Sequence, residues 1–422
     1  MSQRHEKPGP SSATLVAGAG LLTMLAVLLA SCGGAREPSP PTPGGDRLTR
    51  RLDRVLEAAV EECRVGGAVL LVSRDGELVY RRAVGWADRE RRLPLREDAL
   101  FRYASVTKPF VATAALVLVR RGALSLDDTV DRYLPDFRPR LTDGSTPPIS
   151  IRHLLTHTSG LGYSFSEPDG GPYHEAGVSD GLDAPGLAFE ENARRLATVP
   201  LLARPGTAFN YSLSTDVLGE VVARAHGTSL PEAVTELVLR PLGLTAARFH
   251  AHDAADLVVP YADGDECPVR MEEGHRVPFG ASALVFSPRR ALDPRSYPSG
   301  GAGMLGTPGE LMTLLEALRV GDERLLPRDT ALGALRDQLS DGDTSWLGEG
   351  VGFGYVGSVV TDPRAAGRDV NAGTVQWGGV YGHSWWIDPV SRRTVVLMTN
   401  TTLEGMSGQL ASDVEAAALS RD

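Results

Sequence analysis

Apolar positions recur along the chain with two different periods. In residues 48–63 they fall three and four positions apart, which predicts an amphipathic helix. Residues 66–85 instead hold two apolar runs around Asp75-Gly76, a pattern typical of a β-hairpin. Near the C-terminus, apolar runs predict three more strands, and a helical pattern predicts a closing helix. These segments are residues 352–361, 382–388, 394–399 and 403–420, respectively.

The middle of the chain has mainly a helical period, and several segments there carry clear end signals. Thr307-Pro308-Gly309-Glu310 is a capping box with proline at the first helical position, and Gly227 ends another helix. The candidate helices are residues 111–121, 151–157, 190–198, 215–226, 231–239 and 308–318.

These elements predict an α/β (α+β) fold with a helical insertion. Residues 47–112 and 296–422 would form the α/β domain, an antiparallel sheet flanked by the terminal helices. Residues 113–295 would form a mainly helical domain, and the cleft between the two is the expected place of a functional site.

The first residues have the pattern of a targeting segment rather than part of the fold. Residues 1–31 combine a basic start with an apolar run that ends in Leu29-Ala30-Ser31-Cys32, which resembles the bacterial lipobox. This resemblance implies cleavage before Cys32 and lipid on Cys32; a plain signal peptide and a membrane anchor are the alternatives. Residues 32–46 are dense in Pro and Gly and predict an extended linker. We expect an exported lipoprotein of a bacterial cell envelope, on the periplasmic side of the outer membrane or on the cell surface.

Composition narrows the classes of partner. The net charge is −10 and the chain has no block of basic residues, so nucleic acid is not an expected partner. The cysteines other than Cys32 are Cys63 and Cys267. Export allows these two to pair, but two cysteines far apart in sequence do not by themselves specify a disulfide.

One basic residue differs from almost all others in the chain. Of the 43 Lys and Arg residues, only Lys7 and Lys108 are lysine, and Lys7 lies in the targeting segment. Arginine keeps its proton, whereas a lysine in an apolar, desolvated site can lose its charge near neutral pH. Ser105 lies three positions before Lys108 at the predicted start of a helix, so the two side chains can meet across one turn. Because an amine can take the proton of a serine hydroxyl, this pair predicts acyl transfer through Ser105.

The Ser105-x-x-Lys108 motif is accompanied by longer stretches that occur in the order of a known superfamily. Together they resemble the serine β-lactamases and penicillin-binding proteins, and in particular the class C-like esterases known as family VIII carboxylesterases. The resemblance runs from about residue 50 to 415 and implies a β-lactamase/transpeptidase-like fold without a cofactor. The stretches are "GALSLDDTVDRYLPDF", "IRHLLTHTSGLGYS", "YSLSTDVLGEVV" and "SGGAGMLGTPGEL".

Two departures from the superfamily pattern indicate the substrate. Leu213 stands where the second motif, Tyr-x-Asn, commonly has Asn, and Trp377-Gly378-Gly379 replaces the Lys-Thr-Gly of class C β-lactamases. Neither Leu nor Trp can make the bonds that the missing amide and ammonium would make to a β-lactam or a peptide stem. Small neutral carboxylic esters are therefore the expected substrates. A class C-like β-lactamase or D,D-peptidase/amidase is the alternative within enzymes, and a non-catalytic penicillin-binding-like lipoprotein is the alternative outside them.

The resemblance also implies a role for each site residue. Ser105 would be the nucleophile, with Lys108 as its partner. Tyr211 would act as general base or return the proton to the leaving alcohol, and the sequence leaves open which member of this coupled pair holds the proton. The backbone N–H groups of Ser105 and Val380 would form the oxyanion hole. The substrate site would be lined by Trp377, for which simple packing is the alternative, and by Gly378, Gly379 and Leu213.

Other polar residues suggest chemistry that their context does not support. His153 and His157 belong to a segment that ends a helix at Gly160, so we expect structural roles for both. The stretch "FHAHDAAD", residues 249–256, lacks the ligand spacing of histidine-rich metal hydrolases, and we expect no metal there.

Overall fold

The computed structural model describes residues 43–339, 342 and 344–419, which belong to one compact unit that begins at Thr42. The predicted targeting segment and Cys32 lie outside the described residues. The helices are α1 (Pro43–Glu61), α2 (Thr107–Arg120), α3 (Ile151–Leu155), α4 (Pro172–Glu175), α5 (Phe189–Leu196), α6 (Ser214–His226), α7 (Leu230–Val234), α8 (Arg240–Leu242), α9 (Pro308–Val320), α10 (Arg328–Ala334), α11 (Thr402–Ser407) and α12 (Gln409–Leu419).

The strands form one large sheet and several short pairs. They are β1 (Gly67–Arg74), β2 (Glu77–Asp88), β3 (Leu93–Pro94), β4 (Phe101–Arg102), β5 (Tyr261–Ala262), β6 (Val269–Arg270), β7 (His275–Phe279), β8 (Ser282–Phe286), β9 (Leu305–Gly306), β10 (Val351–Phe353), β11 (Ser358–Val360), β12 (Val375–Gly379), β13 (His383–Asp388) and β14 (Arg393–Thr399).

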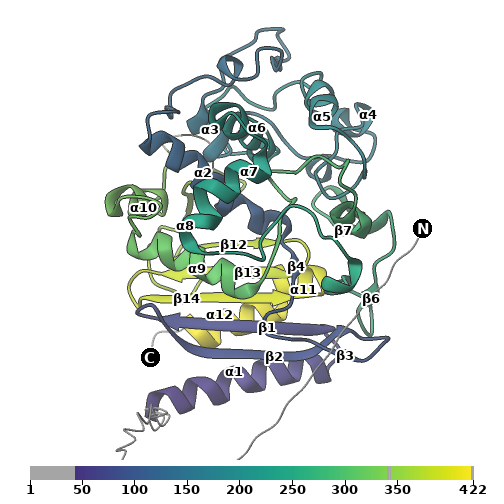
Figure 1. Ribbon diagram of the computed structural model, residues 1–422, viewed down its shortest axis with the longest axis vertical. Coiled ribbons are helices and arrows are strands. Elements are labelled where there is room, and N and C mark those ends of the chain that lie inside the picture. The colour runs from purple at the N-terminus through teal and green to yellow at the C-terminus, as the bar shows by residue number, and fades with distance from the viewer. Residues whose placement is uncertain (1–42, 340–341, 343, 420–422) are drawn as a thin grey trace, which may run out of the picture. The chain divides into compact units, whose positions relative to one another are not determined.

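The large sheet joins the two ends of the described chain. Its order is β10-β11-β12-β13-β14-β1-β2-β3, and every neighbouring pair is antiparallel (Figure 1). β1 pairs with β14 from Ala68 opposite Thr399 to Arg74 opposite Arg393. The predicted antiparallel sheet built from strands near both termini is therefore confirmed.

Side chains of the central strands alternate between two hydrophobic cores, because successive residues of a strand point to opposite faces. In β1, Leu70 and Val72 belong to a core with residues of α1 and α12. Val69 and Leu71 belong to the larger core that extends into the helical part. Accordingly, α1 and α12 pack together on one face of the sheet, and α9 packs on β1 and β14 (Figure 1).

Helix α2 lies inside the helical part and packs against α6. Every residue of α2 from Thr107 to Leu118 is buried, as expected for a helix with apolar side chains on all sides. Two predicted helix ends are confirmed: Thr307 and Glu310 form the capping box of α9, and Gly227 ends α6 in the left-handed conformation with φ of +80°.

The structure corrects the sequence predictions for several elements. Residues 352–361 do not form one strand but the two short strands β10 and β11, which pair with each other. Strand β12 was not predicted, because five residues ending in two glycines leave too short an alternation. The closing helix is broken at Gly408, which has extended backbone between α11 and α12.

The helical part also holds one local irregularity. The predicted helix 231–239 is α-helical only to Val234 and continues as a π-helical turn, Thr235–Leu239. The division into a sheet domain and a helical domain at residues 112 and 296 stays a prediction. Among the described helices, none combines the length and the apolar character needed to cross a membrane.

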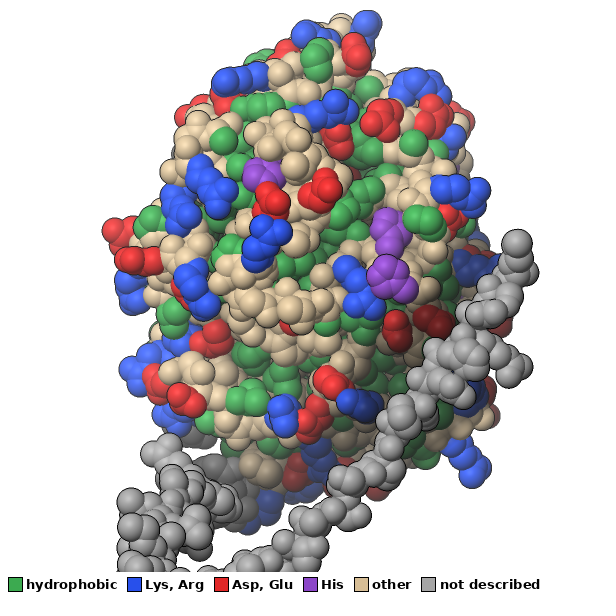
Figure 2. Space-filling model, in the orientation of Figure 1, with side chains coloured by type: hydrophobic (Ala, Val, Ile, Leu, Met, Phe, Trp, Pro, Cys, Tyr) green, Lys and Arg blue, Asp and Glu red, His purple; other side chains and the backbone are tan. Residues whose placement is uncertain are grey.

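The surface carries charges of both signs. On the face shown in Figure 2, Lys and Arg side chains are interspersed with Asp and Glu side chains over the described residues. This face therefore lacks the single-sign basic surface by which proteins bind nucleic acid.

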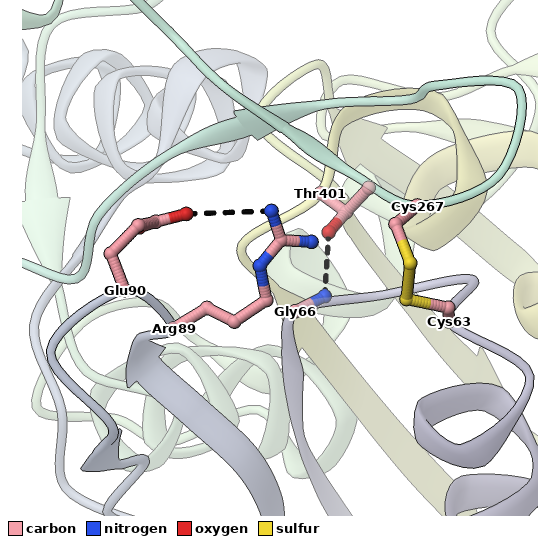
Figure 3. Close-up of a disulfide and its surroundings, with 6 residues drawn as sticks. All are labelled: Cys63, Gly66, Arg89, Glu90, Cys267 and Thr401. Atoms are coloured by element: carbon pink, nitrogen blue, oxygen red, sulfur yellow. Dashed lines mark hydrogen bonds and ion pairs between the residues drawn. A yellow bond between two sulfur atoms is a disulfide. The ribbon is translucent and has the colours of Figure 1, made fainter.

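A disulfide joins Cys63 and Cys267, a pairing that the sequence left open. Cys63 lies between α1 and β1, and Cys267 lies between β5 and β6. Figure 3 shows the bond beside Gly66, whose N–H donates to Thr401 Oγ1 at 3.0 Å. The bond closes a separation of 204 residues and so ties the start of the sheet to a segment from the middle of the chain.

Removing this disulfide is expected to lower the free energy of unfolding by about 2–5 kcal/mol, because the cross-link restricts the unfolded chain. Chemical denaturation of the purified protein with and without reductant measures the effect. The Cys63→Ser variant should start at the lower stability and show no response to reductant. An unchanged denaturation midpoint after full reduction would contradict this prediction.

Candidate active site

Ser105 lies in the 3-10 helix η1 (Ala104–Val106), directly before α2. The preceding Ala104 has φ of +45°, in the left-handed region, so the chain turns sharply just ahead of the serine. Ala104 and Val106 are buried, whereas Ser105 is half-buried and lines the main cavity. The turn thus presents a single hydroxyl to the cavity from an otherwise apolar segment.

The side chain of Lys108 reaches back to this hydroxyl from the first turn of α2. Its Nζ donates to Ser105 Oγ at 3.1 Å and to the carbonyl oxygen of Gly301 at 2.9 Å. Only 5% of the residue is exposed. Nζ also lies 4.7 Å from the centre of the Tyr211 ring. The predicted meeting of Ser105 and Lys108 across one helical turn is therefore present in the structure.

Tyr211 reaches the same hydroxyl from a different part of the chain. It lies just before α6, and its hydroxyl donates to Ser105 Oγ at 2.7 Å. The indole N–H of Trp377 donates to the Tyr211 hydroxyl at 3.4 Å, and the two ring centres are 5.0 Å apart. Ser105 Oγ is thus held between an amine and a phenol.

A buried turn stands behind Lys108. Ser299 Oγ donates to Asp216 Oδ1 at 2.6 Å, and the next residues of this turn carry the Gly301 carbonyl that binds Lys108. Burial raises the pKa of Asp216, although the hydrogen bond from Ser299 and the charge of Lys108 act in the opposite direction. The turn fixes the position of the lysine amine.

The last residue of β12 comes unusually close to the turn that carries the serine. A Cβ added to Gly379 would lie well under 3.0 Å from the carbonyl oxygen of Tyr103, a separation that real Cβ atoms essentially never show. Only glycine allows this approach. It places Val380, the first residue after β12, next to the serine turn, as the predicted pair of oxyanion donors requires.

Ser105 and Tyr211 line a cavity of about 460 Å³, whereas the buried Lys108 lies outside its wall. Around Ser105 and Tyr211 its wall is mostly aromatic and aliphatic, with Tyr163, Phe165, Leu182, Phe279, Leu284 and Trp346. Asp180 is the one carboxyl of this part of the wall. It accepts hydrogen bonds from the N–H and the hydroxyl of Ser164, the first at 3.1 Å. Burial raises the pKa of Asp180 to about 7.

Comparison with known proteins identifies the family of this chain. Residues 52–420 match the family model described as Beta-lactamase. The chain belongs to the beta-lactamase family. The match covers the whole sheet and the serine, lysine and tyrosine described above, so the family's fold is confirmed for this chain.

Individual known proteins are similar to this chain over nearly its whole length. Esterase EstB of Burkholderia gladioli is 50% identical over 377 residues, which cover 89% of this chain and 96% of that protein. The solved structure of EstCE1, a hydrolase with promiscuous acyltransferase activity, superposes with a TM-score of 0.85 at 41% identity, covering 89% of this chain and 100% of that one. A simvastatin synthase variant from Aspergillus terreus has a TM-score of 0.71 at 25% identity, covering 88% and 94%.

The histidines near the site pack and cap, as expected from the sequence. His157 is 2% exposed, and burial, with a smaller contribution from the charge of Lys108, lowers its pKa well below the usual range. Its Nδ1 accepts from the backbone N–H of Ser212 at 3.2 Å. His153 accepts from the N–H of Ser150 at 3.2 Å and completes the capping box of α3. Neither reaches Ser105 by any hydrogen bond among the described residues.

The positions predicted to line the substrate site divide into two groups. Trp377, Gly378 and Val380 line the cavity, whereas Leu213 is fully buried and lies outside its wall. Leu213 is therefore a core residue, because the backbone at its position turns into α6 and its N–H donates to Gly162. Sequence reasoning missed the aromatic wall. Of the residues of this wall, only Tyr163 belongs to one of the stretches that resemble the superfamily, "IRHLLTHTSGLGYS".

Proposed function

We propose that the protein is a serine esterase that cleaves small carboxylic esters through an acyl-enzyme on Ser105. The observation that carries this proposal is the convergence of Lys108 Nζ, at 3.1 Å, and the Tyr211 hydroxyl, at 2.7 Å, on Ser105 Oγ. Similarity to an esterase at 50% identity and to a hydrolase at 41% identity supports the ester as the bond that is cleaved.

In the first half of the reaction, Ser105 Oγ attacks the carbonyl carbon of the ester. Its proton passes to the Lys108–Tyr211 pair, and the carbonyl oxygen becomes an oxyanion bound by the N–H groups of Ser105 and Val380. The bond to the leaving alcohol then breaks. Tyr211 returns the proton to the alcohol oxygen, leaving an acyl group on Ser105.

In the second half, a water molecule attacks the acyl carbon. Its proton passes to the same pair, the bond between Ser105 Oγ and the acyl carbon breaks, and the serine regains its proton. The products are a carboxylic acid and an alcohol. Lys108 and Tyr211 act together in both halves, because both contact Ser105 Oγ and the lysine Nζ lies 4.7 Å from the centre of the Tyr211 ring.

The polarity of the cavity favours neutral substrates. Trp377 occupies the position of the class C lysine and directs its indole N–H to Tyr211, so it offers no charge to a substrate carboxylate. The aromatic wall near Ser105 suits a short apolar acyl group, because burial of apolar surface stabilises the complex. An anionic β-lactam would find no cation to match its carboxylate in this wall.

The experiment compares turnover of p-nitrophenyl acetate or butyrate with that of a chromogenic cephalosporin. We expect kcat/KM for the esters to exceed that for the β-lactam by at least about 100-fold, the size of discrimination that pocket contacts provide. Opening of the β-lactam ring with negligible ester cleavage would show that the protein is a β-lactamase instead.

A fluorophosphonate probe tests the nucleophile directly. The probe should label the wild type and fail to label Ser105→Ala. The Ser166→Ala variant is the matched control, because Ser166 is exposed and outside the cavity wall. A wild type that resists labelling would indicate a non-catalytic protein.

The resemblance of residues 29–32 to a lipobox supports attachment to a membrane through lipid on Cys32. The protein would then work at the bacterial cell envelope, with the Pro- and Gly-rich residues 33–46 as a spacer between lipid and enzyme. Expression of the full chain in a bacterium tests this. The Cys32→Ala variant should move from the detergent phase to the aqueous phase; equal partitioning of the two proteins would refute the anchor.

A further inference from the structure

The cavity around Ser105 has a second part that differs in chemistry from the first. The wall described above, mostly apolar, comes from residues 163–302 and Trp346 and is called here the apolar arm. The rest comes from the sheet side of the molecule and is called the polar arm. Its polar side chains are Ser358, Arg368, Gln376, Ser407, Ser412 and Glu415, and they lie beside the apolar Trp386, Met406 and Ala411.

The two arms meet at an open edge of the sheet. β11 pairs with β12 only at Val375 and Gln376, so within the described residues β11 leaves the edge of β12 uncovered beyond Gln376. Trp377 faces Tyr211, and its neighbour Gln376 therefore faces the opposite side of the sheet. There Gln376 lies beside its pairing partner Trp386. The cavity passes around this edge at Gly378, which lines it.

Met406 of α11 lies at the place where the two arms meet. A Cβ on Gly378 would lie 3.0 Å from Met406 Cγ, so the methionine packs directly on this glycine. Met406 also lines the cavity. A flexible side chain thus lies beside Gly378 where the two arms meet.

The polar arm offers hydrogen bonds but little net charge. Arg368 Nε donates to Glu415 at 3.1 Å, and these two side chains are only 18% and 19% exposed, so the ion pair neutralises itself. Trp386 Nε1 donates to the same carboxylate at 3.0 Å. The amide of Gln376 is half-buried and forms no hydrogen bond with any described residue. Amides and serine hydroxyls both donate and accept, as alcohol hydroxyls do.

We propose that the polar arm binds a hydroxylated alcohol portion of the ester, of the size of glycerol or a sugar, while the apolar arm binds a short acyl group. Tyr211 returns the proton to the leaving alcohol and contacts Trp377, which precedes Gly378, so the alcohol leaves close to the place where the two arms meet. The reaction converts the ester and water into a short carboxylic acid and a polyhydroxylated alcohol. This inference rests on the proposed esterase function.

Two acetates of similar size that differ in hydroxyl groups test the proposal. We expect kcat/KM for methyl 6-O-acetyl-glucopyranoside to exceed that for cyclohexylmethyl acetate by about tenfold, the effect of one or two hydrogen bonds. In Gln376→Leu this ratio should fall to about one. The matched control is Gln409→Leu, because Gln409 is exposed, bonds Asp413 and lies outside the cavity wall; its ratio should equal that of the wild type.

A second variant tests the passage itself. Met406→Trp narrows the route at Gly378 and should lower kcat/KM for the sugar acetate at least about tenfold more than that for methyl acetate, which needs only the space at Ser105. A wild type that prefers cyclohexylmethyl acetate to the sugar acetate would overturn the polar arm as an alcohol site. So would an unchanged ratio of sugar acetate to cyclohexylmethyl acetate in Gln376→Leu together with an unchanged ratio of sugar acetate to methyl acetate in Met406→Trp. If either result is found while p-nitrophenyl acetate is still cleaved, only the polar-arm proposal fails and the proposed esterase function remains. Loss of all ester cleavage would refute the function itself.

Discussion

Replacing Lys108 by arginine is expected to leave the fold intact and to lower kcat/KM for p-nitrophenyl acetate by about 1000-fold, within the usual range for losing acid–base catalysis. The guanidinium keeps its positive charge but cannot release its proton. Its planar fork also differs in shape from the single ammonium that contacts both Ser105 and Gly301. Steady-state kinetics on the purified variant measures the effect.

Far-UV circular dichroism and thermal unfolding of Lys108→Arg provide the control, because the lysine lies in the first turn of a buried helix. A folded variant that loses turnover supports the assigned role. If the folded variant instead keeps a tenth or more of the wild-type activity, Lys108 does not handle the proton of Ser105.

Gly379→Ala is expected to lower kcat for the same ester by about 100- to 1000-fold, the usual effect of losing one oxyanion donor. The added methyl group would overlap the Tyr103 carbonyl oxygen, and both partners are backbone, so β12 must move away from the serine turn. That movement displaces the N–H of Val380. KM should change much less than kcat, because the donor acts on charge that develops in the transition state.

Gly333→Ala is the matched control for this substitution. Gly333 lies in α10, and a Cβ there meets no atom within 4 Å. We expect its kinetics to equal those of the wild type and its stability to rise slightly, since alanine favours a helix over glycine. Equal kcat in Gly379→Ala and Gly333→Ala would contradict the proposed oxyanion site.

Local patterns predicted most of the helices and strands but failed where an element was short. The capping box at Thr307 and the glycine at 227 mark helix ends through interactions within a few residues, and the structure confirms both. Strand β12 exists because β13 pairs with it over its full length. A five-residue segment that ends in two glycines carries too little periodicity to predict that pairing.

Local sequence patterns also failed to predict two features of the site, namely the aromatic wall and the buried position of Leu213. The second motif correctly indicated the segment of Tyr211, whose hydroxyl reaches Ser105. Two positions later the chain turns into α6, so Leu213 faces the core instead of the substrate. The direction of a side chain at such a turn depends on what packs against it, which no local spacing reveals.

The sequence by itself predicted that Ser105 and Lys108 could meet, because residues three apart at the start of a helix share a face. Only the tertiary structure decided what surrounds that pair. The Tyr211 hydroxyl comes from 106 positions away, the Gly301 carbonyl from 193 positions away from Lys108, and the disulfide from two segments 204 residues apart. Such contacts arise because whole elements pack against a common core. Many core residues that belong to no motif contribute to this packing, so no local pattern predicts the contacts.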